Sequence, residues 1–282
     1  MITVGIPFFN DSRYLDMAIR SVFNQSYQDW ILILIDDGST DGSLDIAYKY
    51  NDDPRVKIVS DRLNKKLPAR LNQMIDMADT KYFARMDADD IMHPERLAIQ
   101  LEILENNPDI DVLGTNAYTI DADNNITGLR QPSSNEIITA HGFIHPSVMA
   151  KSSWYKKNKY DEAAVRSEDT LLWGGARQHS VFRTTRQPLM FYREVGGTYY
   201  KKYWIKSKAF LYMAIDSASD KRYSKYYLLK ESVLGLLKGV TYLAFTVLGQ
   251  EDRLIRNRNK GVLSANQANY AIQLLKAAIA GV

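Results

Sequence analysis

The first hundred residues alternate regularly between strand-like and helix-like segments. Apolar runs at residues 2–9, 30–35, 56–59 and 82–86 have the length and residue types of strands. The segments between and after them repeat their apolar residues at helical spacing, and Asn10 or Ser12 is expected to cap the first helix. Parallel strands need such crossovers, so the pattern predicts an α/β fold with a mixed, mostly parallel sheet flanked by helices.

Three of the predicted strands end in unusual groups of polar residues. Residues 7–10 read PFFN, residues 36–39 read DDGS, and residues 87–90 read DADD. Ligands of parallel sheets bind at the carboxyl ends of the strands. We therefore predict that the three groups meet in one crevice.

The DADD group has the most specific chemistry. Asp87, Asp89 and Asp90 repel one another when charged, so a folded chain keeps them together at low cost only with a cation or water. Mg²⁺ and Mn²⁺ take oxygen ligands from one or two carboxylates together with a diphosphate. The alternative is an acidic turn that only caps the next helix.

Other polar residues near these strand ends allow two interpretations each. Asp37 can accept a hydrogen bond from a ring N–H such as N3–H of uracil, or can serve only its own turn. Phe9 can stack on a base or belong to the core. Arg70, at the start of a helix, can meet a phosphate or lie on the surface.

The middle of the chain, residues 109–200, is less regular and contains further candidates. Glu168 and Asp169 precede an apolar helix that contains Trp173; they can favour its dipole, or one can act as general base on an acceptor hydroxyl. His145 is a candidate polar contact, although a single histidine is more often structural.

The last part of the chain differs from the rest in its net charge and in its long helical patterns. Residues 201–282 hold 14 Lys/Arg and 5 Asp/Glu, a net +9, whereas the whole chain is +3. They contain seven tyrosines, an apolar stripe over residues 226–244 and a capping box at Ser264. The region therefore favours a helical, basic appendage that faces an anionic membrane. The alternatives are a solvated helical surface, packing on the catalytic domain and a homodimer.

Taken in order, the motifs resemble those of the family 2 inverting nucleotide-sugar glycosyltransferases, which have the GT-A fold. The match covers residues 4–10, 35–41 and 86–90, and then 168–169 ahead of Leu172-Trp173. It spans about residues 1–200. The resemblance divides the chain into a catalytic domain, 1–200, with a nucleotide-sugar half (1–108) and an acceptor half (109–200), followed by the helical region 201–282.

The resemblance implies a role for each residue on the donor side. Phe9 would lie against the base and Asp37 would bind its N–H. Asp87 would contact the ribose side, and Asp89, with Asp87, would ligate Mn²⁺ or Mg²⁺ on the diphosphate. Arg70 resembles the arginine of the family's A-R-N, although here the text is A-R-L-N. The donor-side set is Pro7, Phe9, Asn10, Asp37, Arg70, Asp87 and Ala88.

On the acceptor side the resemblance implies one catalytic base. Asp169 would take this role with Glu168 alongside, and His145 and Trp173 would lie near the acceptor. In-line attack inverts the anomeric carbon, so no carboxylate nucleophile is needed. The implied partners are a UDP-sugar donor and a glycan or lipid-linked acceptor of surface polysaccharide synthesis. No nucleic acid is expected.

Three other classes of protein are less well supported. An Asp-x-Asp phosphatase carries its motif on the first strand, whereas here it follows the fourth. A Rossmann dehydrogenase needs G-x-G-x-x-G after strand one, which is missing. A non-catalytic sugar-binding or scaffold protein would not need to retain Asp89 and Asp169.

Composition and hydropathy predict the location. The chain has no cysteine, which excludes disulfide scaffolds, thiolate nucleophiles and Cys-based metal sites. We expect no signal peptide, because residues 1–12 read as a strand and turn. The longest uncharged apolar run, residues 239–249, is too short to span a bilayer. The expected location is cytoplasmic, or peripheral on the cytoplasmic face of the inner membrane.

Overall fold

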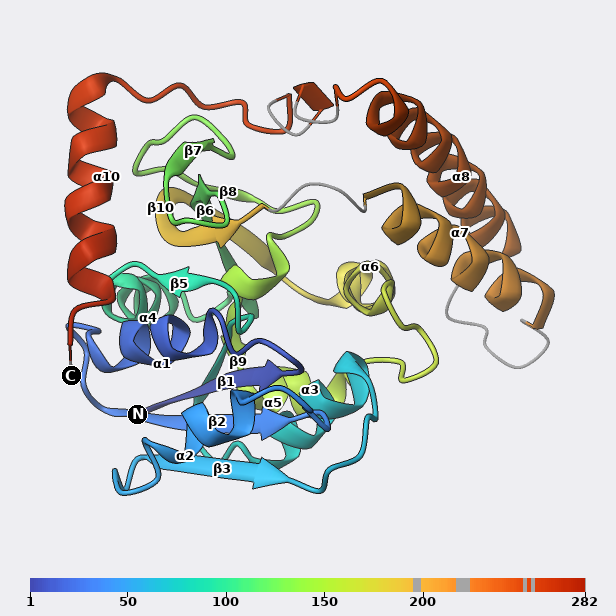
Figure 1. The fold of residues 1–282 in the computed structure, drawn as a ribbon. Helices are drawn as coiled ribbons and strands as arrows, with labels where there is room; N and C mark the ends of the chain where they lie inside the picture. Colours follow the sequence, from blue (N-terminus) through green and yellow to red (C-terminus); the bar gives the residue numbers. More distant parts are fainter. Residues whose placement is uncertain (195–198, 217–223, 251–252, 255–256, 282) are drawn as a thin grey trace.

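The computed structural model describes residues 1–194, 199–216, 224–250, 253–254 and 257–281. Its centre is one sheet with the strand order β3-β2-β1-β4-β9-β6-β10-β5, to which β7 and β8 add at β6 and β10 (Figure 1). The strands are β1 (Ile2–Phe8), β2 (Trp30–Asp36), β3 (Val56–Ser60), β4 (Tyr82–Arg85), β5 (Ile91–Met92), β6 (Val112–Ile120), β7 (Ile126–Leu129), β8 (Ile137–Thr139), β9 (Met149–Lys151) and β10 (Phe182–Arg193).

The sheet is parallel on one side and mixed on the other. Strands β1 to β4 pair in parallel, as the strand–helix alternation predicts. Beyond them, β9 runs antiparallel to both β4 and β6, while β10 runs parallel to β6. The predicted mixed, mostly parallel α/β sheet is therefore confirmed, with the irregular second half supplying the antiparallel strands.

Helices cover both faces of the sheet. They are α1 (Leu15–Phe23), α2 (Ser43–Tyr48), α3 (Leu67–Met77), α4 (Arg96–Asn106), α5 (Ser152–Lys157), α6 (Glu168–Ala176), α7 (Tyr199–Asp216), α8 (Lys225–Val247) and α10 (Ala265–Ala278), with short 3₁₀ turns at His145–Ser147 and Arg177–His179. Helices α1, α2 and α4 pack on one face and α3, α5 and α6 on the other.

Strand β2 is apolar at nearly every position because it is covered on both faces. Leu32 and Leu34 point into the core under α1 and α4, whereas Ile33 and Ile35 point into the core under α3. Successive side chains of a strand alternate between faces, so a strand covered on both faces must be apolar at every position.

One local expectation is wrong. Helix α1 begins at Leu15 after Tyr14, with no side-chain cap from Asn10 or Ser12. Asn10 instead adopts a left-handed backbone conformation, φ 55°, and bonds to the loop after β2. Its polar groups are used between loops rather than at the helix end.

The C-terminal region is helical, as predicted, and its helices lie in two places. Helices α7 and α8 form an antiparallel hairpin at one side of the molecule, and α10 lies at the other (Figure 1). Ala271, Leu275 and Ala278 of α10 pack on the sheet, and Ser264 and Gln267 form the expected capping box. Among the described residues, none of the helices combines the length and apolarity needed to cross a membrane. The predicted boundary near residue 200 adjoins residues 195–198, which lie outside the described part.

Candidate active site

The loops after β1 and β2 are tied together by hydrogen bonds. The Asn10 backbone N–H donates to Ser39 Oγ (3.1 Å), and the Thr40 N–H donates to Asn10 Oδ1 (2.8 Å). Pro7 stays inside β1, while the Phe9 side chain is 45% exposed at the strand end. The first two polar groups therefore lie side by side, as predicted, with an accessible aromatic ring between strand and loop.

Asp37 and Arg70 form a buried ion pair behind this loop. The Asp37 carboxylate accepts from the backbone N–H groups of Lys65 (2.7 Å) and Lys66 (3.1 Å) and from Arg70 Nε (2.9 Å). Arg70 is fully buried, which rules out the surface alternative, and its other nitrogens bond to Asp61 and two further acceptors. Arg70 thus holds Asp37 and the loop 61–66 in place from inside the protein.

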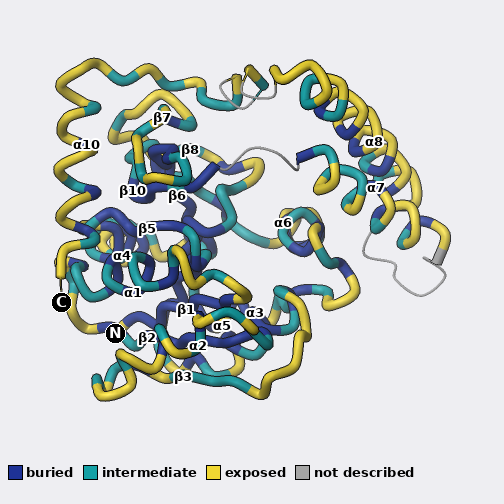
Figure 2. Tube along the Cα trace, in the orientation of Figure 1, coloured by how far each residue is buried: buried dark blue, intermediate teal, exposed yellow. Residues whose placement is uncertain are grey.

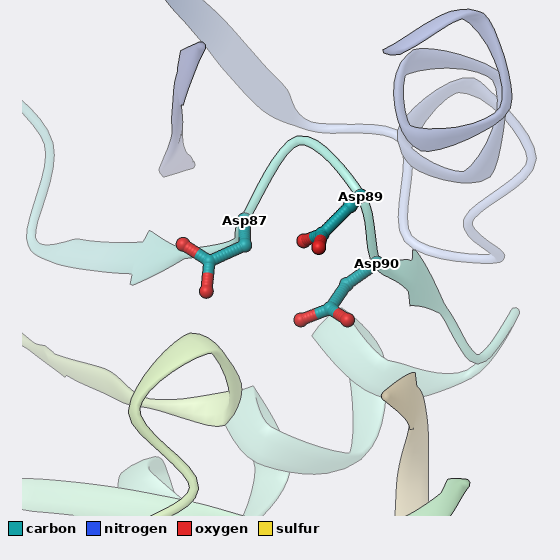
Figure 3. Close-up of side chains that lie close together, drawn as sticks. All are labelled: Asp87, Asp89 and Asp90. Carbon is teal, nitrogen blue, oxygen red and sulfur yellow. The ribbon is translucent and has the colours of Figure 1, made fainter. Parts of the chain in front are cut away.

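The three carboxylates of the DADD group converge after β4. Asp87, Asp89 and Asp90 offer oxygen atoms that all lie within 4.8 Å of one another, and their side chains face a common space (Figure 3). Ala88 between them is buried in the core, so only its backbone faces the turn. One carboxylate oxygen, Asp90 Oδ2, is buried and has no hydrogen-bond partner.

Two arginines position this carboxylate cluster from different elements. Arg85, fully buried in β4, donates to Asp87 and keeps two nitrogens without a hydrogen-bond partner. Arg193, at the end of β10, donates from Nε to the Asp89 carbonyl (2.7 Å) and from Nη2 to Asn124 (2.7 Å). Its backbone N–H donates to Asp90 Oδ1 (2.8 Å). The acidic turn is therefore held rigidly on the sheet.

Burial and mutual repulsion make these carboxylates hard to ionise. Burial, with Asp87 and Asp11 nearby, raises the pKa of Asp89 to about 6. Burial also raises the pKa of Asp90 well above its ordinary value, assisted by Asp89 and Asp87. A divalent cation would reverse both effects, because it compensates the charges that burial and crowding disfavour. The donor set, three hard oxygen ligands with one unpartnered, fits Mg²⁺ or Mn²⁺.

The two acidic residues at the start of α6 have different environments. Glu168 is buried, and its Oε2 has no hydrogen-bond partner. Burial, and after it the charge of Asp169, raises the pKa of Glu168 to about 7, whereas the charge of Arg85 lowers it. Asp169 is half-buried, and its Oδ1 accepts from the Thr170 N–H (2.6 Å). Only Asp169 of the two lines an open cavity.

That cavity, about 560 Å³, lies between α6 and the start of α8. It is lined by His141, Gly142, Phe143, Asp169, Thr170, Trp173, Gly174, Arg177, Gln178, Ser224 and Tyr227. Trp173 lines the cavity, and its ring packs on the rings of Trp154 and Phe182. His145 lies behind Trp173, where Nε2 bonds to Tyr160 Oη (2.8 Å) and burial lowers its pKa well below the ordinary value. His145 is thus a neutral structural neighbour of the cavity wall.

The family model for glycosyl transferase family 2 matches residues 3–177, more than half of the chain. The chain belongs to glycosyl transferase family 2. The matched residues include every predicted site residue from Pro7 to Trp173, so the resemblance drawn from the motifs is confirmed at the level of the family.

Relatives of this family 2 chain include putative and uncharacterised glycosyltransferases. The putative glycosyltransferase EpsE of Bacillus subtilis is 37% identical over 181 residues, 61% of this chain and 65% of EpsE. The uncharacterised glycosyltransferase MJ1057 of Methanocaldococcus jannaschii is 33% identical over 183 residues, 61% of this chain and 63% of that protein. The chain thus spans less than two thirds of the length of these relatives.

Among solved structures, TarS of S. aureus has a similar fold. TarS residues 1–349 in complex with UDP match 98% of this chain and 79% of that chain, with a TM-score of 0.61 and 16% identity. The complex of TarS residues 1–349 with UDP-GlcNAc matches 99% of this chain and 81% of that chain, with a TM-score of 0.62 and 16% identity. At this identity the likeness supports the GT-A fold of the family 2 chain, C-terminal helices included.

Sequence reasoning singled out Arg70 but missed Arg85 and Arg193. Arg85 was detectable, since it is the one charged residue in an otherwise apolar strand. Arg193 carries no local signal: it reaches the acidic turn only because β10 pairs with β6 and β5. Asp90 lies in the predicted motif but was not singled out as a ligand, and the structure adds it to the cluster.

Proposed function

We propose that this family 2 protein transfers a sugar from a nucleoside diphosphate sugar, most simply a UDP-sugar, to a hydroxyl of a glycan or lipid-linked acceptor. One observation carries the proposal: three carboxylates with oxygens within 4.8 Å of one another stand at the carboxyl end of β4 in a family 2 chain. A diphosphate leaving group needs compensation of its charge at such a position.

The donor would lie across the ends of β1, β2 and β4. Phe9 would stack on the base, since its ring is exposed beside Asn10 at the strand end. Asp37 would accept the N3–H of uracil with the lone pair that its two backbone donors and Arg70 leave available. The TarS complexes contain UDP and UDP-GlcNAc, which makes UDP-GlcNAc the first donor to test.

Asp87 and Asp89, with Asp90, would hold Mn²⁺ or Mg²⁺. A bound divalent cation would compensate the charge that develops on the leaving diphosphate. Arg85 and Arg193 keep the three carboxylates in place, and Arg85 also limits the repulsion between Asp87 and Glu168.

Asp169 would act as the general base, because its half-buried carboxylate lines the cavity where an acceptor can enter. It takes the proton of the acceptor hydroxyl as that oxygen bonds to the anomeric carbon, and the bond from this carbon to the diphosphate oxygen breaks. Because the acceptor oxygen attacks one face of the anomeric carbon while the diphosphate leaves from the opposite face, the configuration at that carbon is inverted. Glu168, which is buried near Arg85, would position the start of α6.

The remaining sequence predictions concern the partners of the protein. We propose a role in surface polysaccharide synthesis at the cytoplasmic face of the inner membrane, with the basic residues 201–282 toward anionic lipid. A homodimer stays a prediction.

The test is a panel of nucleotide sugars with Mn²⁺. We expect slow release of UDP from UDP-GlcNAc or another UDP-sugar, and tighter binding of UDP than of ADP by at least about tenfold, because adenine lacks the N3–H donor. Release of inorganic phosphate would instead indicate a phosphatase, and no binding or release with any sugar would indicate a scaffold protein. Equal affinity for ADP and UDP would contradict the role of Asp37.

A further inference from the structure

Helix α8 turns most of its large apolar side chains away from the protein. Val233 is 56% exposed, Leu237 58% and Tyr226 78%, and Figure 2 shows the helix largely as exposed. These belong to one stripe along the same side of the helix, which we call the outer face. The outer face consists of Tyr226, Leu229, Val233, Leu236, Leu237, Val240 and Val247. A helix in water ordinarily places polar residues on this side.

The opposite face of α8 packs on α7 through small residues. Ser207 Oγ donates to the Ser232 carbonyl (2.7 Å), and Ser232 Oγ donates to the Ser207 carbonyl (2.9 Å). A Cβ atom at Gly239 would lie 2.5 Å from Nε1 of Trp204, so only glycine allows this approach. Small residues and hydrogen bonds between helices are how helices associate in lipid, where apolar side chains provide no driving force. The contact between the two helices therefore leaves the outer face exposed, apart from the edge at Leu236, which borders α7.

The surroundings of the outer face are positively charged. The sequences of α7 and α8 contain seven lysines and two acidic residues. Lys206 bonds to α6 and Lys202 faces the carboxylate cluster, so the lysines that matter for the outer face are among the other five. Lys201 and Lys208 border a groove of about 380 Å³ that also contains Trp204, Ile205 and Leu236, so apolar and basic side chains share one surface. Lys225 and Lys230 are exposed along the helix that carries the outer face.

We propose that the outer face of α8, with the lysines around it, binds the surface of an anionic lipid bilayer and lies in its headgroup layer. The apolar side chains would enter the acyl boundary, and the lysines would pair with lipid phosphates. The charge decides between this partner and a second copy of the chain, because a copy would bring the same lysines to the contact and repel them.

The hairpin is connected to the proposed acceptor cavity. Lys206 Nζ donates to Thr170 Oγ1 of α6 (2.8 Å), and Phe210 and Leu228 pack on Leu171. Tyr227, at the start of α8, lines the cavity beside Asp169. A bilayer under the outer face would lie next to this cavity; the conclusion that a lipid-linked acceptor enters there rests on the proposed function.

The experiment is flotation of the full chain with vesicles of phosphatidylglycerol and phosphatidylcholine, compared with phosphatidylcholine alone. We expect binding to the anionic vesicles only, weakened by salt. Val233→Glu should lower the bound fraction about tenfold, since it places a charge at the acyl boundary. Val262→Glu is the matched control: it is the same change in the same basic region at a valine that is 90% exposed outside the outer face, and it should stay within about twofold.

A second variant tests the charge without altering the apolar side chains. Lys225→Ala with Lys230→Ala should lower binding by about fivefold per lysine. The proposal is overturned if the unaltered chain does not float with anionic vesicles, if Val262→Glu is as damaging as Val233→Glu, or if light scattering finds a dimer that only Val233→Glu dissociates. Flotation requires no turnover, so its failure is distinct from failure to transfer sugar.

Discussion

The carboxylate cluster and the α7–α8 hairpin depart from the usual distribution of side chains in opposite directions. After β4 the chain buries charged groups, with Asp90 and Arg85 almost inaccessible to water. On α8 it exposes apolar groups such as Val233 and Leu237. Each departure costs stability unless something outside the chain compensates it. The comparison teaches that each region calls for compensation from outside the chain. We propose a cation and diphosphate for the carboxylate cluster and anionic lipid for the hairpin.

Removing one carboxylate of the cluster should have the largest effect. Asp89→Ala deletes a proposed metal ligand, so we expect UDP release in Mn²⁺ to fall below detection and UDP binding by calorimetry to weaken. The fold should persist, because the change also relieves repulsion among buried carboxylates. Asp52→Ala, at an exposed aspartate, is the control and should keep full activity. Near-normal turnover of Asp89→Ala would mean that Asp89 is not a ligand.

The next largest effect should come from the cavity between α6 and the start of α8. Asp169→Asn removes the proposed base without changing its size, and we expect the rate at saturating donor to fall about 10²-fold or more. Donor affinity, measured by calorimetry, should be unchanged because the proposed place of Asp169 is on the acceptor side. A full rate at saturation with lost donor affinity would reverse this assignment.

The cost of buried charge can be measured through the pH dependence of stability. The pKa of Glu168 is about 7 in the folded protein, raised mainly by burial from an ordinary value of 4.5. Between these values the folded state binds more protons than the unfolded one, so the metal-free protein should lose stability as pH rises from about 4.5 to 7. We expect a loss of roughly 2 kcal/mol in the free energy of unfolding by urea.

Two variants test how much of this pH dependence of stability comes from Glu168. Glu168→Gln should remove the part of the decline that comes from Glu168 and leave the part that comes from Asp89 and Asp90, whose pKa values burial also raises. Glu102→Gln, at an exposed glutamate, should leave the whole decline unchanged. An equal slope in the unaltered chain and in Glu168→Gln would show that Glu168 does not titrate in this range.

The smallest effect should come from the contact between α7 and α8, where a substitution changes the free energy of unfolding. Gly239→Ala places a Cβ within 2.5 Å of the Trp204 ring, and such overpacking costs about 1–3 kcal/mol. Alanine recovers up to about 1 kcal/mol of helix propensity. We therefore expect a net loss of about 1 kcal/mol in urea unfolding. Gly142→Ala, where nothing lies within 4 Å, should be nearly neutral. A more stable Gly239→Ala protein would show that this contact is looser than described.

Local patterns were sufficient for the first half of the fold. Strands β1 to β4 and the helices after them agree with the apolar periodicities, and the three polar groups follow the strand ends as expected. The antiparallel insertion of β9 between β4 and β6 could not be predicted, because it depends on pairing between residues far apart in sequence. The role of Arg193 follows from that same pairing and was invisible for the same reason.

The sequence by itself determined the family, the acidic turn and the apolar stripes of the C-terminal helices. It could not determine which stripe is covered: α10 buries Ala271 and Leu275 against the sheet, while α8 keeps Val233 and Leu237 in the open. Both stripes obey the same helical period, since periodicity records which side chains share a face and not what lies opposite. The tertiary structure decided it. Small residues such as Ser232 and Gly239, together with Leu228 and Tyr242, form the contact of α8 with α7, and the outer face stays exposed within the described chain.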